Sequence, residues 1–133
     1  MGETSLTGAH HVALNVSELD RSVQWYADVL DFRYLVSYDT DDFDRRILGH
    51  PSGFFIALTR HRHPDAGGAF ADHVTGLDHL SLGVANRDDL DAWVARLDAV
   101  GIAHNGIQVS PATGYTLVAF RDPDGIQLEL YLA

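Results

Sequence analysis

The chain has 133 residues, no cysteine and a formal net charge of −10, and 46 % of its residues are hydrophobic. These values predict one globular domain, residues 1–133, and they exclude disulfides and cysteine-ligated metals. The negative charge argues against nucleic acid and against anionic membrane surfaces as partners, because both require a basic face. The sequence shows no apolar run of membrane-spanning length and no secretory leader pattern, which predicts a cytoplasmic protein.

The stretch GAHHVALNV, residues 8–16, has a counterpart in GLDHLSLGV, residues 76–84. Each is a short apolar strand pattern with a histidine three residues after a glycine, and each leads into a polar segment and a helix-like stretch. His11 and His79 occupy equivalent positions in the two stretches. A repeat on this scale predicts two similar halves within the chain.

The predicted halves are module 1, at about residues 8–60, and module 2, at about residues 76–133. Residues 61–75 between them contain glycine and proline and are the predicted connector.

In module 1, residues 18–32 carry apolar side chains at helical spacing, and Ser17 is the predicted N-cap. Turn-forming residues then separate three strand-like stretches. The apolar helix positions are Leu19, Val23, Tyr26 and Leu30, and the strand-like stretches are residues 32–39, 43–50 and 53–60.

Module 2 follows the same order. Residues 86–102 predict a helix with Asn86 as N-cap and Gly101 as a left-handed stop. Each half therefore reads βαβββ. The predicted fold is α+β, with two paired βαβββ modules forming a curled, antiparallel-rich sheet around a metal-binding cavity. The strand-like stretches are residues 103–110, 115–122 and 125–132.

Pseudo-symmetry between the halves is expected to bring His11 and His79 into one cavity. In the last strand pattern, alternation places Glu129 on the face opposite its leucine neighbours, so the carboxylate is expected to face that cavity. A carboxylate in a core-like strand is costly unless it is paired or bound to a cation. Two imidazoles and one carboxylate predict a metal site with free coordination positions. Module 1 has Ala57 at the position equivalent to Glu129, so no fourth ligand is expected there.

The same alternation predicts a substrate cup of Phe55, Ala57 and Tyr131. His10 is expected to be a solvent-facing neighbour of the predicted ligand, because adjacent strand residues face opposite ways. No general base is evident, and the candidates are Tyr115, Gln127 and His63.

The stretches HHVALNVSELDRSVQWYADVLDF, GLDHLSLGV and RDPDGIQLEL resemble the vicinal oxygen chelate superfamily over nearly the whole chain. That superfamily includes glyoxalase I, bleomycin resistance proteins, fosfomycin-resistance transferases, methylmalonyl-CoA epimerase and extradiol dioxygenases. The resemblance implies that a divalent metal binds His11, His79 and Glu129, and it favours His11 over His10.

Departures from the family patterns separate its members. The resemblance implies that glyoxalase I has a second glutamate, and methylmalonyl-CoA epimerase a polar ligand, at the position where this chain has Ala57. Glyoxalase I activity is therefore not expected. It also implies that extradiol dioxygenases and fosfomycin transferases have a tyrosine where this chain has Ala119. Fosfomycin transferases are further expected to have a threonine where this chain has Ala13. Bleomycin-binding members lack the metal ligands.

The resulting hypothesis is a metal-dependent dioxygenase, lyase or isomerase acting on a small substrate that chelates the metal through vicinal oxygens. The metal could be Fe²⁺, Zn²⁺, Mn²⁺ or Ni²⁺. The alternative is a non-catalytic protein that sequesters an aromatic compound or antibiotic. The resemblance also implies a homodimer, with the modules paired within one chain or exchanged between two.

Overall fold

A computed structural model describes residues 4–63 and 69–133. The chain divides into two compact units, Met1–Ala66 and Gly67–Ala133. The division falls inside the stretch predicted as a connector.

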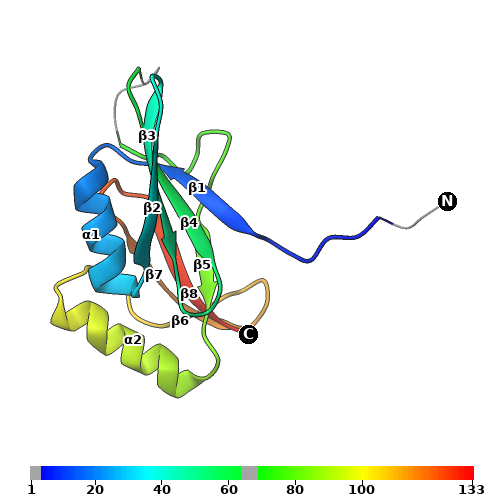
Figure 1. Ribbon diagram of the computed structural model, residues 1–133. Coiled ribbons are helices and arrows are strands. Elements are labelled where there is room, and N and C mark those ends of the chain that lie inside the picture. The colour runs from blue at the N-terminus through cyan, green and yellow to red at the C-terminus, as the bar shows by residue number, and fades with distance from the viewer. Residues whose placement is uncertain (1–3, 64–68) are drawn as a thin grey trace. The chain divides into compact units, whose positions relative to one another are not determined.

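The first unit contains one helix and a four-stranded sheet with the strand order β1-β4-β3-β2 (Figure 1). Strands β1 and β4 pair in parallel, and the other neighbours are antiparallel. Its elements are β1 (His11–Asn15), α1 (Leu19–Leu30), β2 (Arg33–Asp39), β3 (Phe43–Gly49) and β4 (Phe55–His61).

The second unit repeats this plan, with the strand order β5-β8-β7-β6 and a parallel β5–β8 pair. The α+β prediction and the βαβββ order of each half are confirmed. The predicted curling around a shared cavity concerns both units together and stays a prediction. The elements of this unit are β5 (Leu80–Gly83), α2 (Arg87–Ala99), β6 (Gln108–Val109), β7 (Thr116–Arg121) and β8 (Gln127–Leu132).

Each helix covers one face of its own sheet, and the two cores form where they meet. Helix α1 contacts β2, β3 and β4, and α2 contacts β7 and β8. Alternate strand residues supply the buried apolar side chains on the helix-covered faces. In the first unit these are Leu14, Leu48, Ile56 and Leu58, and in the second they are Val118, Phe120, Leu128 and Leu130.

Several local predictions were wrong. Glu18, not Ser17, is the N-cap of α1, and it makes no side-chain capping bond. The strand predicted at residues 103–110 is reduced to Gln108–Val109. Phe54 and Tyr115, both expected on strands, lie just before β4 and β7. Apolar periodicity places the elements but leaves their ends to local turn geometry.

Other predictions were confirmed. Asn86 caps α2, because its side chain accepts a hydrogen bond from the Asp89 backbone N–H. Gly101 has φ +76° and follows the helix, as the left-handed stop requires. Among the helices of residues 4–63 and 69–133, none combines the length and hydropathy needed to cross a membrane.

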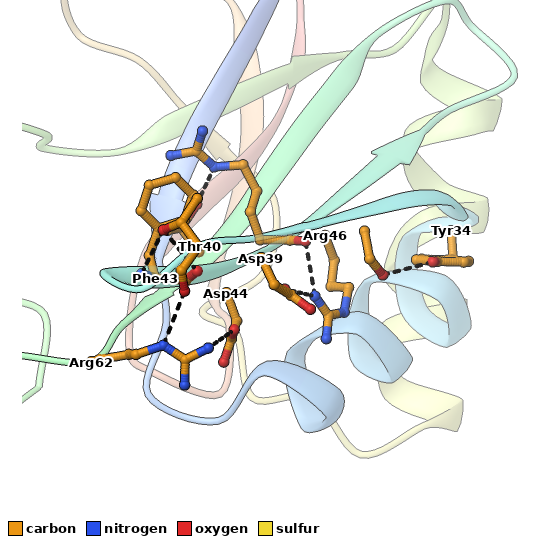
Figure 2. A network of polar contacts seen from close by, with 10 residues as sticks. Tyr34, Asp39, Thr40, Phe43, Asp44, Arg46 and Arg62 are labelled. Atoms are coloured by element: carbon orange, nitrogen blue, oxygen red, sulfur yellow. Dashed lines mark hydrogen bonds and ion pairs between the residues drawn. The ribbon is translucent and has the colours of Figure 1, made fainter.

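One ion pair lies within the β2–β3 hairpin, and a second joins the hairpin to the residue that follows β4. Arg46 bonds to the Asp39 carboxylate at 2.6 Å, and Arg62 bonds to Asp44 (Figure 2). The guanidinium of Arg46 holds the pKa of Asp39 below its usual range.

We expect Asp39→Asn to lower the free energy of unfolding at neutral pH but not at strongly acidic pH. The folded-state pKa of Asp39 is depressed, so its stabilisation is present above the unfolded value, about 3.9, and is lost as pH falls through the folded value. Denaturant melts of both proteins between pH 2 and pH 7 measure this difference. Asp41→Asn, in the same turn, is the control. A difference that persists at the lowest pH would contradict the ionic origin.

We also expect Asn86→Ala to destabilise the protein by about 1 kcal/mol, because an amide N–H in the first turn of α2 loses its acceptor. Glu18→Ala is the matched control at α1, whose N-cap makes no such bond, and it should cost less than about 0.5 kcal/mol. Thermal and urea denaturation of both variants measure the comparison, and equal losses would show that Asn86 does not act as a cap.

Candidate functional site

Strand β8 presents Glu129 on the sheet face opposite α2. The turn before the strand sets this register, because the Asp122 side chain accepts hydrogen bonds from the backbone N–H groups of Asp124 and Ile126. Leu128 and Leu130, on either side of Glu129, point into the core and are 0 % and 2 % exposed. The alternation predicted for this strand is therefore confirmed, and it leaves a carboxylate that is only 9 % exposed.

His79, just before β5, lies against this carboxylate. Its Nε2 is 3.3 Å from Oε2 of Glu129, and its Nδ1 is 2.7 Å from Oδ1 of Asp78. When Nδ1 carries the proton and donates it to Asp78, the lone pair of Nε2 faces the Glu129 side. The imidazole is thus oriented by one carboxylate and directed toward another.

The Glu129 carboxylate has two further partners on the same face. Ser81 donates its hydroxyl to Oε2 at 2.8 Å, and Gln127 donates its amide to Oε1 at 3.4 Å. Arg121 in turn donates to the amide oxygen of Gln127 at 3.4 Å and to the Gly125 carbonyl at 2.8 Å. These bonds account for the burial of a carboxylate in an apolar strand.

The His79–Glu129 distance suits two neighbouring ligands of one metal ion. Ligand atoms about 2.1 Å from a metal, at an angle of about 90–110°, lie about 3.0–3.4 Å apart. A direct charge-assisted N–H···O bond is shorter, about 2.7–2.9 Å. The observed 3.3 Å fits the first geometry better, and the imidazole nitrogen and carboxylate oxygen are donors that divalent metals accept.

The third predicted ligand, His11, begins β1 in the first unit. It pairs with Phe55 of β4, and its Nδ1 is 2.7 Å from Nδ1 of His10. His10 is solvent-exposed, as predicted. It precedes the strand and its ring stacks on Phe55 at 5.9 Å, so strand alternation is not the reason for its exposure.

The predicted cup residues fall in both units. In the first unit, Ala57 pairs with Ala13 of β1 and is 3 % exposed. In the second, Tyr131 bonds through its hydroxyl to Thr113, and Tyr115 lies edge-on to it at 6.1 Å. The shared substrate cup of Ala57 and Tyr131 therefore stays a prediction.

The candidate bases are placed differently. Gln127 is bonded to Glu129 and Arg121, Tyr115 is 46 % exposed outside its strand, and His63 is exposed beside residues that the structure does not describe.

Among residues 4–63 and 69–133, no three or more histidine, aspartate or glutamate side chains form a group that could hold a metal. A surface cavity of about 470 Å³ lies in the first unit, where Glu18 of the α1 N-terminus, Arg46 and Arg60 are among its lining residues. It contains none of the predicted site residues. The His79–Glu129 pair is therefore the part of the predicted site that the described structure brings together.

Sequence reasoning missed Asp78 and Ser81. Both belong to the repeated stretch, where module 1 has His10 and Ala13 at the corresponding positions. An aspartate and a serine beside a predicted ligand could have indicated this role from the sequence, because polar residues that flank a metal ligand commonly orient it.

Comparisons with known proteins agree with this architecture. Residues 8–130 match the sequence profile of the glyoxalase/bleomycin resistance protein/dioxygenase superfamily. A domain of that description from Frankia sp. EAN1pec has a crystal structure with 38 % identity and a TM-score of 0.87, covering 97 % of this chain and 99 % of that one.

Two relatives with known names have different activities. A lactoylglutathione lyase from Haemophilus influenzae is 32 % identical over 90 % of this chain and 87 % of its own length. A catechol-2,3-dioxygenase from Bacillus subtilis is 31 % identical over 91 % of this chain but only 40 % of its own length. Similar identities to a lyase and a dioxygenase leave the reaction open. Together, the profile match and the shared βαβββ plan show that this chain belongs to the glyoxalase/bleomycin resistance protein/dioxygenase superfamily.

Proposed function

We propose that this protein is a divalent-metal-dependent enzyme acting on a small substrate that chelates the metal through two adjacent oxygens. The observation that carries the proposal is the His79–Glu129 pair, an oriented imidazole and a buried carboxylate 3.3 Å apart on one face of the second sheet. Such donors commonly serve in metal sites that leave positions free for substrate.

His11 is the proposed third ligand. The matching registers support this role: Ala13 pairs with Ala57 in the first sheet as Ser81 pairs with Glu129 in the second. His11 and His79 each lie two residues before the first member of these pairs and are therefore equivalent. The His11 that completes the site comes either from the same chain or from a second copy.

A bound divalent ion would supply Lewis-acid stabilisation of negative charge on substrate oxygens. The chain's own residues prepare the donors. Asp78 fixes the tautomer of His79, while Ser81 and Gln127 each hold one oxygen of Glu129. These bonds reduce the rearrangement needed when the ligands engage a cation.

Two positions near the proposed ligands bear on the proposed reaction class. Ala57, at the position equivalent to Glu129, brings no fourth protein ligand. This argues against this chain having the lactoylglutathione lyase activity for which the Haemophilus relative is named. Ala119 pairs with Glu129 across β7 and β8, where an extradiol dioxygenase is expected to have a tyrosine. We therefore propose either extradiol-type oxygen chemistry, if the metal is iron, or lyase or isomerase chemistry on a substrate other than that of a lactoylglutathione lyase.

A second candidate is a binding protein that sequesters an aromatic compound. The bonding of Gln127 favours it, because this amide is occupied with Glu129 and Arg121 and does not act as a base at neutral pH. Metal bound without turnover of any vicinal-oxygen substrate would support this second candidate.

We expect the purified protein, incubated with Fe²⁺, Zn²⁺, Mn²⁺ or Ni²⁺ and then dialysed, to retain one ion per site in elemental analysis. His11→Ala, His79→Ala and Glu129→Ala should each lose it, because each removes one of three protein donors. His73→Ala is the matched control, since this histidine is 84 % exposed and its ion-pair partner is Asp72 rather than Glu129.

Full metal retention in folded His79→Ala and Glu129→Ala proteins would overturn the proposal. Mixing His11→Ala with Glu129→Ala subunits gives a further result. Recovery of metal binding in the mixture shows that ligands come from two chains, whereas no recovery places them within one chain.

We expect Asp78→Asn to weaken metal affinity about tenfold, because loss of the carboxylate partner frees the tautomer and the ring of His79. The effect should lie at the low end of the usual range because Asp78 is exposed. Competition with a chromogenic chelator measures the affinity. Asp91→Asn, which removes an exposed carboxylate paired with Arg87 on α2, should leave it unchanged. Equal affinities in all three proteins would remove Asp78 from the site.

A further inference from the structure

The face of the first sheet opposite α1 carries a guanidinium that the proposed function does not use. Arg45 on β3 pairs with Thr59 of β4 on one side and with Tyr38 of β2 on the other. Its side chain projects to the opposite sheet face from Arg46, whose strand partner Leu58 is in the core under α1.

The Arg45 side chain is held in place by two contacts. Its Nε donates to the hydroxyl of Thr59 at 2.9 Å, and Thr59 is 1 % exposed. Its Cζ lies 4.3 Å from the ring centroid of Phe43, a cation–π arrangement. A half-buried guanidinium fixed in this way has already lost much of the side-chain entropy that anion binding would otherwise remove.

Within the described part of the chain, the charge of Arg45 is not neutralised by a carboxylate. Arg46 and Arg62 each pair with an aspartate, and Figure 2 shows both ion pairs. For Arg45, no carboxylate of the described ranges 4–63 and 69–133 lies within ion-pair distance. Its contacts use Nε and the face of the guanidinium, so the terminal N–H groups stay available for an anion that accepts two hydrogen bonds.

The neighbours of this guanidinium are apolar or aromatic. Tyr38 is 53 % exposed and lies 5.9 Å from the ring of Phe43, and Val36 is 52 % exposed next along the same strand face. Ile47, which pairs with Val36, lies two residues from Arg45 on β3. An anion bound here would have its remaining atoms against these side chains.

We propose that Arg45 and the surrounding face of β2 and β3 bind a small amphiphilic anion, with one acidic group on an aromatic or aliphatic body. The acidic group takes the free N–H groups of Arg45, and the body covers Tyr38, Val36 and Ile47. Ile47 is the strand partner of the predicted cup residue Ala57, so this site lies on the cup face of the first sheet, and the proposal rests on the proposed function by naming a residue that anchors an acidic group of the substrate. None of its residues is a proposed metal ligand, so binding measured without metal tests it separately from the metal site.

The test uses two fluorescent probes with the same rings. 1-Anilinonaphthalene-8-sulfonate carries an acidic group, and N-phenyl-1-naphthylamine does not. We expect Arg45→Gln to raise the Kd of the sulfonate about tenfold and to change the Kd of the neutral probe less than twofold. Titrations in EDTA keep the measurement independent of any metal. Arg45→Lys, which keeps the charge but loses the planar fork, should fall between wild type and Arg45→Gln.

Arg60→Gln is the matched control. Arg60 also has no ion pair among the described residues. It is the backbone strand partner of Asp44, and its side chain lies on the α1 side of the sheet. Its loss should leave both probes unaffected. An unchanged sulfonate Kd in Arg45→Gln overturns the proposal. So does an equal loss of both probes, which indicates a packing role, or an equal loss in Arg60→Gln, which indicates general charge. If Arg45→Gln instead dissociates a dimer without affecting the sulfonate, the occupant is a second copy and the proposal is wrong.

Discussion

The burial of one carboxylate constrains the second unit more than any other feature. Glu129 occupies the middle of β8, between two leucines that must stay in the core, so the strand cannot turn it to solvent without exposing them. Its charge is therefore compensated locally, by the Ser81 hydroxyl and the Gln127 amide. The arrangement that makes burial tolerable is also the arrangement that presents oriented donor atoms on one sheet face.

The two units share one scaffold but differ in the chemistry they place on it. Their strand orders and registers correspond, so that Ala57 and Glu129 occupy the same position in the two sheets. An alanine in the first unit needs no compensation, and its neighbour Ala13 is apolar where the second unit has Ser81. Polar partners thus occur where a buried charge requires them. The two sheets thus have the same strand order, but only the second carries a carboxylate at this position.

Alternation also separates the arginines of the first unit into two kinds. Arg46 lies on the α1 side and pairs with Asp39, whereas Arg45, the next residue, is held by a hydroxyl and an aromatic ring. A strand sends successive side chains to opposite faces, so neighbouring residues of the same type meet different surroundings. In a chain with a net charge of −10, an arginine that meets no carboxylate among the described residues offers a positive site for an external anion.

The sequence alone determined the βαβββ repeat, the face on which Glu129 lies and the equivalence of His11 with His79, because all three follow from periodicity and register. It did not determine where elements end: the α1 cap moved from Ser17 to Glu18, since capping depends on local dihedral angles. Only the tertiary structure decided that His79 meets Glu129 at 3.3 Å, that Asp78 and Ser81 orient them, and that Arg45 is held by Thr59 and Phe43. These contacts join residues on different elements, and packing selects the rotamers of the side chains that make them. The pattern of residues along one strand contains no information about either.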